Sequence, residues 1–123
     1  MTLDANIVIK YLDGDQAIIS AIQQWRRMEV TIFLPAVAES EVLSFSQFSP
    51  VEITKTEIFL EENFTFIPFD RQIARIAADI RRKTKIKFPD AAIAATALYT
   101  RTPLVTRNQQ DFKKIPDLQV ITI

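Results

Sequence analysis

Hydrophobic positions along the chain alternate between short apolar runs and the spacing of one helix face. A short strand is predicted at 2–4, and it is followed by the apolar run Ile7–Leu12 and by a turn at 13–15. This turn contains Gly14, the only glycine, which suits a backbone with positive φ. Apolar residues then recur at helical spacing over 16–27, so we predict a helix there with Asp15 as its N-cap.

The alternation continues to the end of the chain. Pro35, Pro50 and Pro68 separate the segments, and Pro89 suits the first turn of a late helix. The predicted elements of this part are strands at 31–34, 64–69, 104–106 and 118–123, and helices at 37–45, 51–63, after Asp70, from Pro89 to about Tyr99 and at 109–114, with a basic loop at 83–88.

Strands that alternate with helices predict an α/β fold. We expect a central, mostly parallel sheet of about four or five strands, flanked by helices on both faces, in one domain over 1–123. Functional sites of such sheets lie beyond the carboxyl ends of the strands. The residues that follow each predicted strand are therefore the first candidates for function.

Composition narrows the possible chemistry. The chain has no cysteine and no histidine, which excludes disulfides, thiolate or histidine metal sites and Ser-His-Asp or Cys-His catalysis. Carboxylates remain as the catalytic groups of an enzyme. Oxygen ligands of that kind select hard cations such as Mg²⁺ or Mn²⁺.

The net charge is zero, but the charges are unevenly distributed. Residues 1–70 hold 11 acidic and 4 basic residues, whereas residues 71–123 hold 4 acidic and 11 basic residues. The densest basic stretch, at 71–87, could follow the phosphates of a nucleic acid, or it could simply be a solvated helix face. No signal peptide or membrane-spanning segment is recognisable, so we expect a cytoplasmic protein.

Four acids fall at the predicted carboxyl edge of the sheet. Asp4 ends the first strand, Glu41 lies in the helix after the second, Asp90 begins the helix after the basic loop, and Asp111 follows the strand at 104–106. Clustered carboxylates repel one another, and a cation that also binds phosphate oxygens relieves this repulsion. Each acid also has a local interpretation as a turn, cap or exposed helix residue, and Glu39 competes with Glu41.

Four local motifs resemble those of PIN domains. The segments are LDANIVI at 3–9, EVLSF at 41–45, FPDAAIAATA at 88–97, and LVTRN at 104–108 followed by DF at 111–112. Their order and spacing most resemble VapC-type toxins of type II toxin–antitoxin pairs. The resemblance implies a homodimeric, Mg²⁺-dependent endoribonuclease (Mn²⁺ also serving) that hydrolyses RNA with a metal-activated water and is inhibited by a cognate antitoxin.

The resemblance also assigns roles to individual residues. Asp4, Glu41 and Asp90 are the implied metal ligands and catalytic acids, with Asp111 favoured over Asn108 as the fourth. Asn6, Thr106 and Asn108 are expected to orient the acids, although Asn6 could instead cap the first helix. The expected RNA contacts are Arg81, Arg82, Lys85, Lys87 and Arg107.

Three further expectations remain open at this stage. Family members usually carry a hydroxyl where this chain has Ala5, which we expect to have a modest effect. A transfer RNA is the first candidate substrate. One alternative to a nuclease is a catalytically weak metal- or RNA-binding regulatory module of the same fold. The other is an interaction protein that only binds its partner, through a hydrophobic groove. The residues of that groove, which could instead belong to the hydrophobic core, are Phe45, Phe48, Ile58, Phe59 and Leu60.

Overall fold

Five short strands form one parallel sheet at the centre of the molecule. The computed structural model describes residues 1–123. The sheet has the strand order β3-β2-β1-β4-β5, and every neighbouring pair is parallel. Thr2 is aligned with Phe33 on one side and with Leu104 on the other. The strands are β1 (Thr2–Leu3), β2 (Phe33–Pro35), β3 (Thr65–Ile67), β4 (Leu104–Val105) and β5 (Val120–Ile121).

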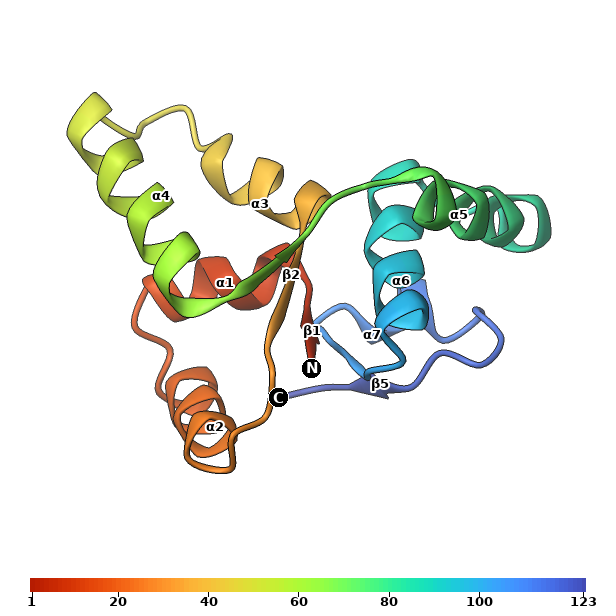
Figure 1. The fold of residues 1–123 in the computed structure, drawn as a ribbon, viewed down its shortest axis with the longest axis horizontal. Helices are drawn as coiled ribbons and strands as arrows, with labels where there is room; N and C mark the ends of the chain where they lie inside the picture. The colour runs from red at the N-terminus through yellow and green to blue at the C-terminus, as the bar shows by residue number, and fades with distance from the viewer.

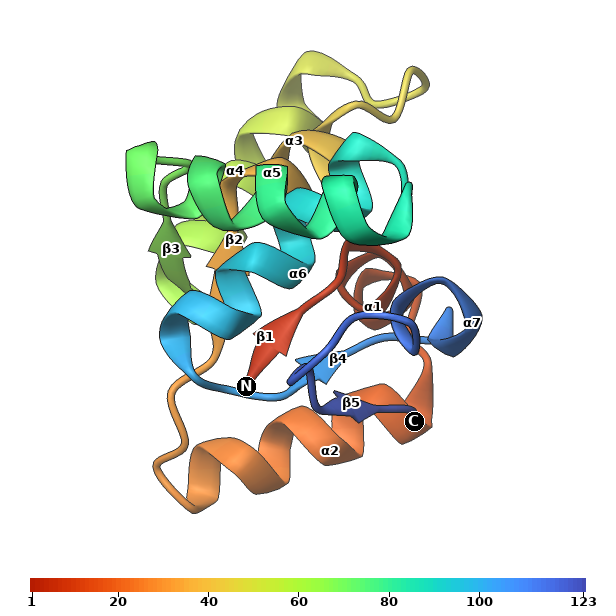
Figure 2. The same ribbon diagram turned by 90° about the vertical axis from the view of Figure 1, so that its right-hand side faces the viewer.

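Helices cover both faces of this sheet. In Figure 1, α1, α2 and α4 lie on one side of the strands, and α5 and α6 lie on the other. The view turned by 90° shows α5 running across α6 (Figure 2). Helix α6 contacts both α5 and β1, so it lies between them. The helices are α1 (Ala5–Leu12), α2 (Gln16–Arg27), α3 (Ala36–Leu43), α4 (Pro50–Asn63), α5 (Arg71–Thr84), α6 (Phe88–Thr100) and α7 (Gln109–Phe112).

The order of the strands explains why helices lie on both faces. The chain adds β2 and β3 on one side of β1, and then returns to add β4 and β5 on the other side. Right-handed crossovers in opposite directions place their helices on opposite faces of the sheet. The predicted three-layer α/β fold with a parallel sheet is therefore confirmed.

Short polar side chains fix the beginnings of several helices. The Asp15 carboxylate accepts a hydrogen bond from the Ile18 N–H at 3.3 Å, and Asp70 accepts from Ile73 at 3.0 Å, both as predicted caps. Ser49 and Glu52 form a reciprocal capping box at the start of α4, which the sequence analysis did not identify. Each such cap contributes about 1 kcal/mol to helix stability.

The core is a single cluster of 24 buried residues. Helix α6 is buried over residues 91–97 without interruption, and five of these residues are alanines. Small side chains allow α6 to pack closely between the sheet and α5. A larger side chain in this segment would cost about 1–3 kcal/mol through overpacking, so the position of α6, and of the acid near its start, is tightly fixed.

Several predicted boundaries are wrong by one or more residues, including those of the basic loop and of the last strand. The expected loop at 83–88 is shorter, because α5 continues through Thr84 and α6 already begins at Phe88. Lys85 ends α5 in the left-handed conformation, with φ of 59°, and donates its backbone N–H to the Arg81 carbonyl. The last strand is limited to β5 rather than 118–123. Among the helices of the structure, none has the length and apolar character needed to cross a bilayer.

Candidate active site

The candidate site lies where the strand order reverses, between β1 and β4. These neighbouring strands end at Leu3 and Val105, so Asp4 and Thr106 follow them at the same edge of the sheet. In parallel sheets the connections that leave two such neighbouring strands run in opposite directions, and this reversal is the usual position of a binding site.

Asp4 lies at the base of the site and is buried, with 6% of its surface exposed. Its Oδ1 accepts a hydrogen bond from the Ala5 N–H at 2.8 Å, and its Oδ2 accepts one from the Thr106 hydroxyl at 2.7 Å. Burial raises the pKa of Asp4, the two hydrogen bonds oppose this increase, and the charge of Asp111 raises the pKa further. Asp4 is therefore held in one orientation but is costly to ionise in the absence of a cation.

Glu41 reaches the same site from the second turn of α3. Its pKa is raised by partial burial and by the charges of Asp4 and Asp90. Glu39, two residues earlier, belongs to a different group, because the acids that raise its pKa after burial are Glu61 and Glu57 of α4. The structure thus separates the two candidate glutamates, and only Glu41 faces the site.

Asp90 stands in the first turn of α6, where the positive end of the helix favours a negative charge. Burial nevertheless raises its pKa, as do the charges of Asp4 and Asp111, and only Lys87 acts in the opposite direction. Asp90 therefore lies within electrostatic reach of acids from both ends of the chain.

The segment after β4 brings the remaining polar candidates together. The Asn108 side-chain amide donates to Asp111, and the Asn108 backbone N–H donates to the Thr106 hydroxyl at 2.9 Å. The Asn6 amide also donates to that hydroxyl, at 3.4 Å. Asn6 lies inside α1, which Asp4 caps, so the alternative of Asn6 as a helix cap is wrong.

These side chains suit a hard cation in their chemistry. Asp4, Glu41, Asp90 and Asp111 supply carboxylate oxygens, and after burial the charges of Asp4, Asp90 and Asp111 raise the pKa values of their neighbours among the first three. No three acidic side chains are close enough in the structure to ligate one ion together. The acids are thus electrostatic neighbours that do not form a closed set of ligands, and a cation of the Mg²⁺ or Mn²⁺ type would stabilise a closer arrangement.

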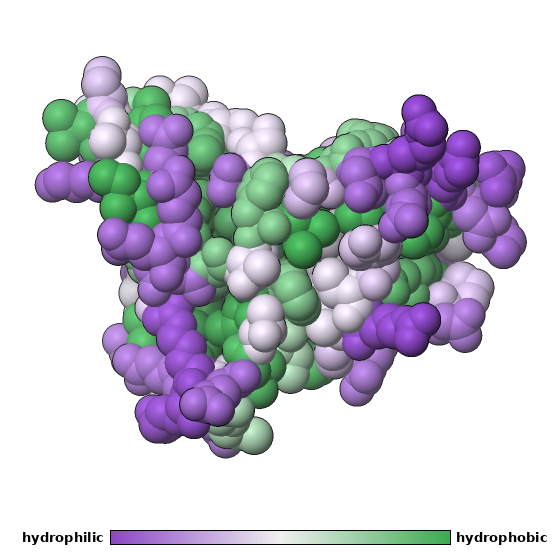
Figure 3. All heavy atoms as spheres, viewed as in Figure 1, coloured by the Kyte–Doolittle hydropathy of each residue, from purple (hydrophilic) through white to green (hydrophobic).

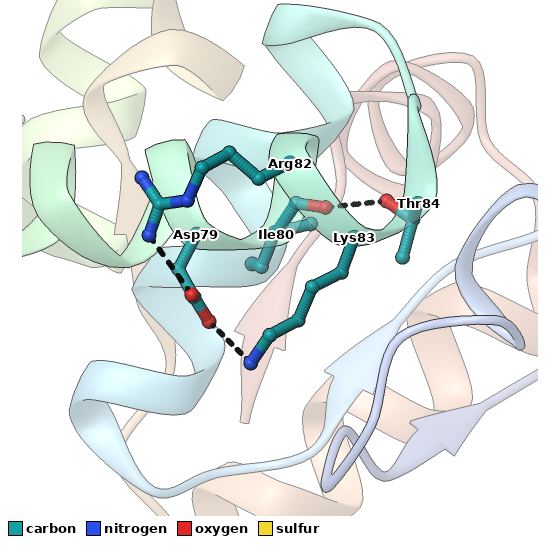
Figure 4. Close-up of polar contacts among 5 residues, drawn as sticks. All are labelled: Asp79, Ile80, Arg82, Lys83 and Thr84. Carbon is teal, nitrogen blue, oxygen red and sulfur yellow. Dashed lines mark hydrogen bonds and ion pairs between the residues drawn. The ribbon is translucent and has the colours of Figure 1, made fainter.

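Basic side chains adjoin the acids at the end of α5. Hydrophilic residues cover this helix in Figure 3. Arg82 and Lys83 both pair with Asp79 at 3.0 Å, yet remain 70% and 62% exposed, so these surface pairs add little stability (Figure 4). The Arg81 Nε donates to the Ile86 carbonyl at 3.3 Å. Lys85 and Lys87 are exposed between α5 and the acid-bearing start of α6.

Arg107 differs from the other predicted RNA contacts. Its guanidinium forms an ion pair with Asp15 at 2.9 Å, and the two side chains are only 35% and 23% exposed. The sequence analysis assigned Asp15 only to the cap of α2. Nothing in the sequence links two residues that far apart, so this contact required the structure.

A pocket of about 530 Å³ adjoins the acids between α1, α3 and α4. Phe45 and Phe48 line it, together with Ile9, Leu12 and Glu41. The hydrophobic cluster expected from the sequence is therefore divided. Leu60 is buried in the core, and Phe59 stacks against Tyr11 rather than lining the pocket.

The fold and the site together define a parallel α/β protein with a carboxylate cluster suited to a hard cation. The sequence matches the PIN domain over residues 1–118, and the chain belongs to this family. The family assignment made from the four motifs is confirmed.

Known relatives agree with this assignment. A curated protein from Rickettsia bellii (strain RML369-C), named Ribonuclease VapC, is 36% identical over 70 residues, which are 53% of this chain and 52% of that protein. The aligned part thus spans about half the length of that relative. A toxin–antitoxin complex from Klebsiella pneumoniae matches with 28% identity and a TM-score of 0.82, over 99% of this chain and 98% of that chain.

A further structural match shows how well the fold is preserved. VapBC2 from Rickettsia felis, solved with a DNA fragment from its promoter, has a TM-score of 0.87 at 22% identity, over 99% of this chain and 97% of that chain. At this identity the match establishes the fold alone. The fold class is nevertheless secure along nearly the whole chain.

Proposed function

We propose that this protein is a Mg²⁺-dependent endoribonuclease, the toxin of a toxin–antitoxin pair. The observation that carries the proposal is the mutual influence of acids from four elements. Asp4, Glu41 and Asp90 each have a pKa raised by burial and by a neighbouring acid, and Asp111 acts on two of them. Carboxylates that repel one another in this way are suitable ligands for a divalent cation, which relieves the repulsion.

The side chains of the site have different roles in this proposal. Asp4, Glu41, Asp90 and Asp111 would hold the ion, with Thr106 fixing the orientation of Asp4 through its hydroxyl. A bound divalent ion supplies Lewis acidity to a phosphodiester and lowers the pKa of water. The chain has no histidine or cysteine to serve as base or nucleophile, which is consistent with hydrolysis by water.

The basic residues beside the acids support RNA as the substrate. Arg81, Arg82, Lys85 and Lys87 are exposed, and Lys87 is close enough to lower the pKa of Asp90. A phosphate chain bound along this surface would pass next to the acids. A transfer RNA, which is compact and carries exposed single-stranded loops, remains the first substrate to test.

Two protein partners belong to the proposal. A cognate antitoxin would occupy the pocket beside Glu41, where Phe45 is 56% exposed and forms an edge-to-face pair with Phe48 at 5.1 Å. The named relative complexes support such a partner. A second copy of the chain would cover the exposed aromatic side chains beside the edge strand β3, namely Phe66, Phe69 and Phe88.

Cleavage assays with matched variants test the enzymatic proposal. The purified chain should cleave RNA with Mg²⁺ or Mn²⁺ and lose this activity with EDTA. Asp4→Asn and Asp90→Asn should each reduce the rate by at least about 100-fold, whereas Glu39→Gln, which removes an acid of α3 that lies outside the site, should retain it. Cleavage that continues without metal would overturn the proposal. Cation binding with no cleavage of any RNA would favour the regulatory module.

A further inference from the structure

The segment that carries Asp111 has little regular structure to hold it in place. Strand β4 has two residues and α7 has four, with Thr106, Arg107 and Asn108 between them. Downstream, Phe112 and Ile115 anchor the segment in the core, with 0% and 4% of their surfaces exposed. Upstream, Thr106 is buried and its backbone N–H donates to the Ile121 carbonyl at 3.0 Å, but residues 107–111 are exposed and need an anchor of their own.

Arg107 supplies that anchor at both its backbone and its side chain. Its backbone N–H donates to the Asn6 Oδ1 of α1 at 3.3 Å. Its guanidinium pairs with Asp15 at the start of α2 at 2.9 Å. The residue therefore spans from the end of β4 to the turn between α1 and α2.

Asp15 is itself held firmly, so it is a fixed point rather than a mobile partner. Its Oδ1 caps α2 through the Ile18 N–H, while its Oδ2 pairs with Arg107. Its backbone N–H donates to the Lys10 carbonyl at 3.0 Å, across a turn in which Gly14 has φ of 87°. Movement of Arg107 away from this position would break the ion pair and leave the Asp15 carboxylate, which is 23% exposed, without its cationic partner.

We propose that the Arg107–Asp15 pair is a clasp that positions Asp111 opposite Asp4 and Asp90, and that Arg107 is a positioning residue rather than an RNA contact. The inference rests on the proposed metal site. Loosening the clasp would release the 107–111 segment at its upstream end. The acids would then be less well arranged for a cation, whereas the exposed basic surface on α5 would be unchanged.

Electrostatics and positioning predict opposite results for one variant. Arg107→Gln removes a positive charge near the acids, which by simple electrostatics would strengthen cation binding. The clasp predicts the reverse, namely that the dissociation constant for Mn²⁺ rises about tenfold, as is usual when a residue supporting a metal ligand is lost. Titration of Mn²⁺ into the RNA-free protein, followed by electron paramagnetic resonance, measures this directly.

Three companion variants complete the experiment. Asp15→Asn keeps an N-cap for α2 but removes the ion pair, so it should fold and also bind Mn²⁺ about tenfold more weakly. The double variant should be no weaker than either single variant, because both remove the same contact. Arg107→Lys should recover part of the affinity, and Arg27→Gln, the same type of charge loss at the far end of α2, should bind as the unmodified protein does.

The outcomes separate this inference from the proposed function. Unchanged or tighter Mn²⁺ binding by Arg107→Gln, or fully additive single effects, would overturn the clasp. A loss of metal-free RNA affinity in Arg107→Gln without any loss of Mn²⁺ affinity would overturn it as well, and would make Arg107 a phosphate contact. If the unmodified protein binds Mn²⁺ but cleaves no RNA, the nuclease proposal fails while the clasp is still tested.

Discussion

Thr106 donates its hydroxyl to Asp4 at 2.7 Å, although 102 positions of sequence separate the two residues. The same hydroxyl accepts hydrogen bonds from the Asn108 N–H and from the Asn6 amide. One small side chain thus joins the end of β1, the start of α1 and the segment before α7. The position of Asp4 depends on this junction as much as on its own strand.

Thr106→Val should show the importance of this junction. The substitution keeps the shape but removes the donor to Asp4, so we expect the free energy of unfolding to fall by about 1–3 kcal/mol. The pKa of Asp4 should rise further, because one of the two hydrogen bonds that lower it is lost. Urea unfolding measures the first effect, and the pH dependence of cleavage measures the second. Thr106→Ser, which retains the hydroxyl, should behave nearly as the unmodified protein does.

Stability without divalent metal should fall as the pH rises through the range in which the site acids ionise. Asp4, Glu41 and Asp90 have raised pKa values in the folded state, so that state binds protons more tightly than the unfolded chain does. Their contribution to stability is complete below about pH 4, near the pKa values of the unfolded chain, and is lost as the pH rises through the folded-state values. Asp15, Glu52 and Asp79 have lowered pKa values and act in the opposite sense.

A variant isolates the contribution of the site from that of the other acids. Asp90→Asn removes one repelling charge, so its unfolding free energy in EDTA at pH 8 should exceed that of the unmodified protein. Added Mg²⁺ should reverse this order by stabilising only the unmodified site. Equal stability of the two proteins in EDTA would contradict mutual repulsion among the acids. Glu62→Gln, on the exposed face of α4, is the matched control.

RNA binding should depend on salt through the basic residues at the end of α5. Lys87→Gln should weaken binding similarly for all sequences, and should reduce the slope of log affinity against log salt by about 0.7 for single-stranded RNA. Fluorescence anisotropy in EDTA measures this without cleavage. An unchanged slope for Lys87→Gln would place the phosphates elsewhere, and Arg27→Gln provides the comparison for a basic residue remote from the site.

Substitutions of Phe69 and Phe45 should test the proposed dimer surface and the proposed antitoxin pocket independently of each other. Phe69 is 37% exposed and packs edge-to-face on Phe88 at 5.5 Å, so Phe69→Glu should give a monomer in light scattering while still binding the antitoxin. Phe45→Glu should remain dimeric but no longer co-purify with the proposed antitoxin when the two are co-expressed. If both variants lose the same contact, the assignment of the two surfaces is wrong.

Much of the fold could be predicted because the spacing of hydrophobic residues differs clearly between the strands and the helices. Apolar runs and helical spacing alternate, and short polar residues such as Asp15 and Asp70 mark helix starts. The boundaries were harder. The basic residues from Lys83 onward suggested a loop, but the hydrophilic last turn of a helix is equally compatible with such residues. Local sequence could not distinguish the two, because the decision depends on packing against α6.

The site was partly predictable for a similar reason. Asp4 and Asp90 occupy a strand end and a helix start, so topology alone brings them to one edge. The Arg107–Asp15 pair and the separation of Glu39 from Glu41 depend on how loops and helix faces meet in three dimensions. No spacing rule describes such contacts, and the preference between Asn108 and Asp111 as fourth ligand stays a prediction.

The reversal of strand order between β1 and β4 also determines when the site can form during synthesis of the chain. The acids that meet there come from residue 4 at one extreme and residue 111 at the other, with β4 inserted against β1 late in the chain. During translation, a nascent chain therefore contains most of the helices before it contains the complete set of acids. A ribosome-bound precursor in which β4 has not yet paired with β1 lacks Asp111 beside Asp4, so under the proposed function it could not yet cleave RNA.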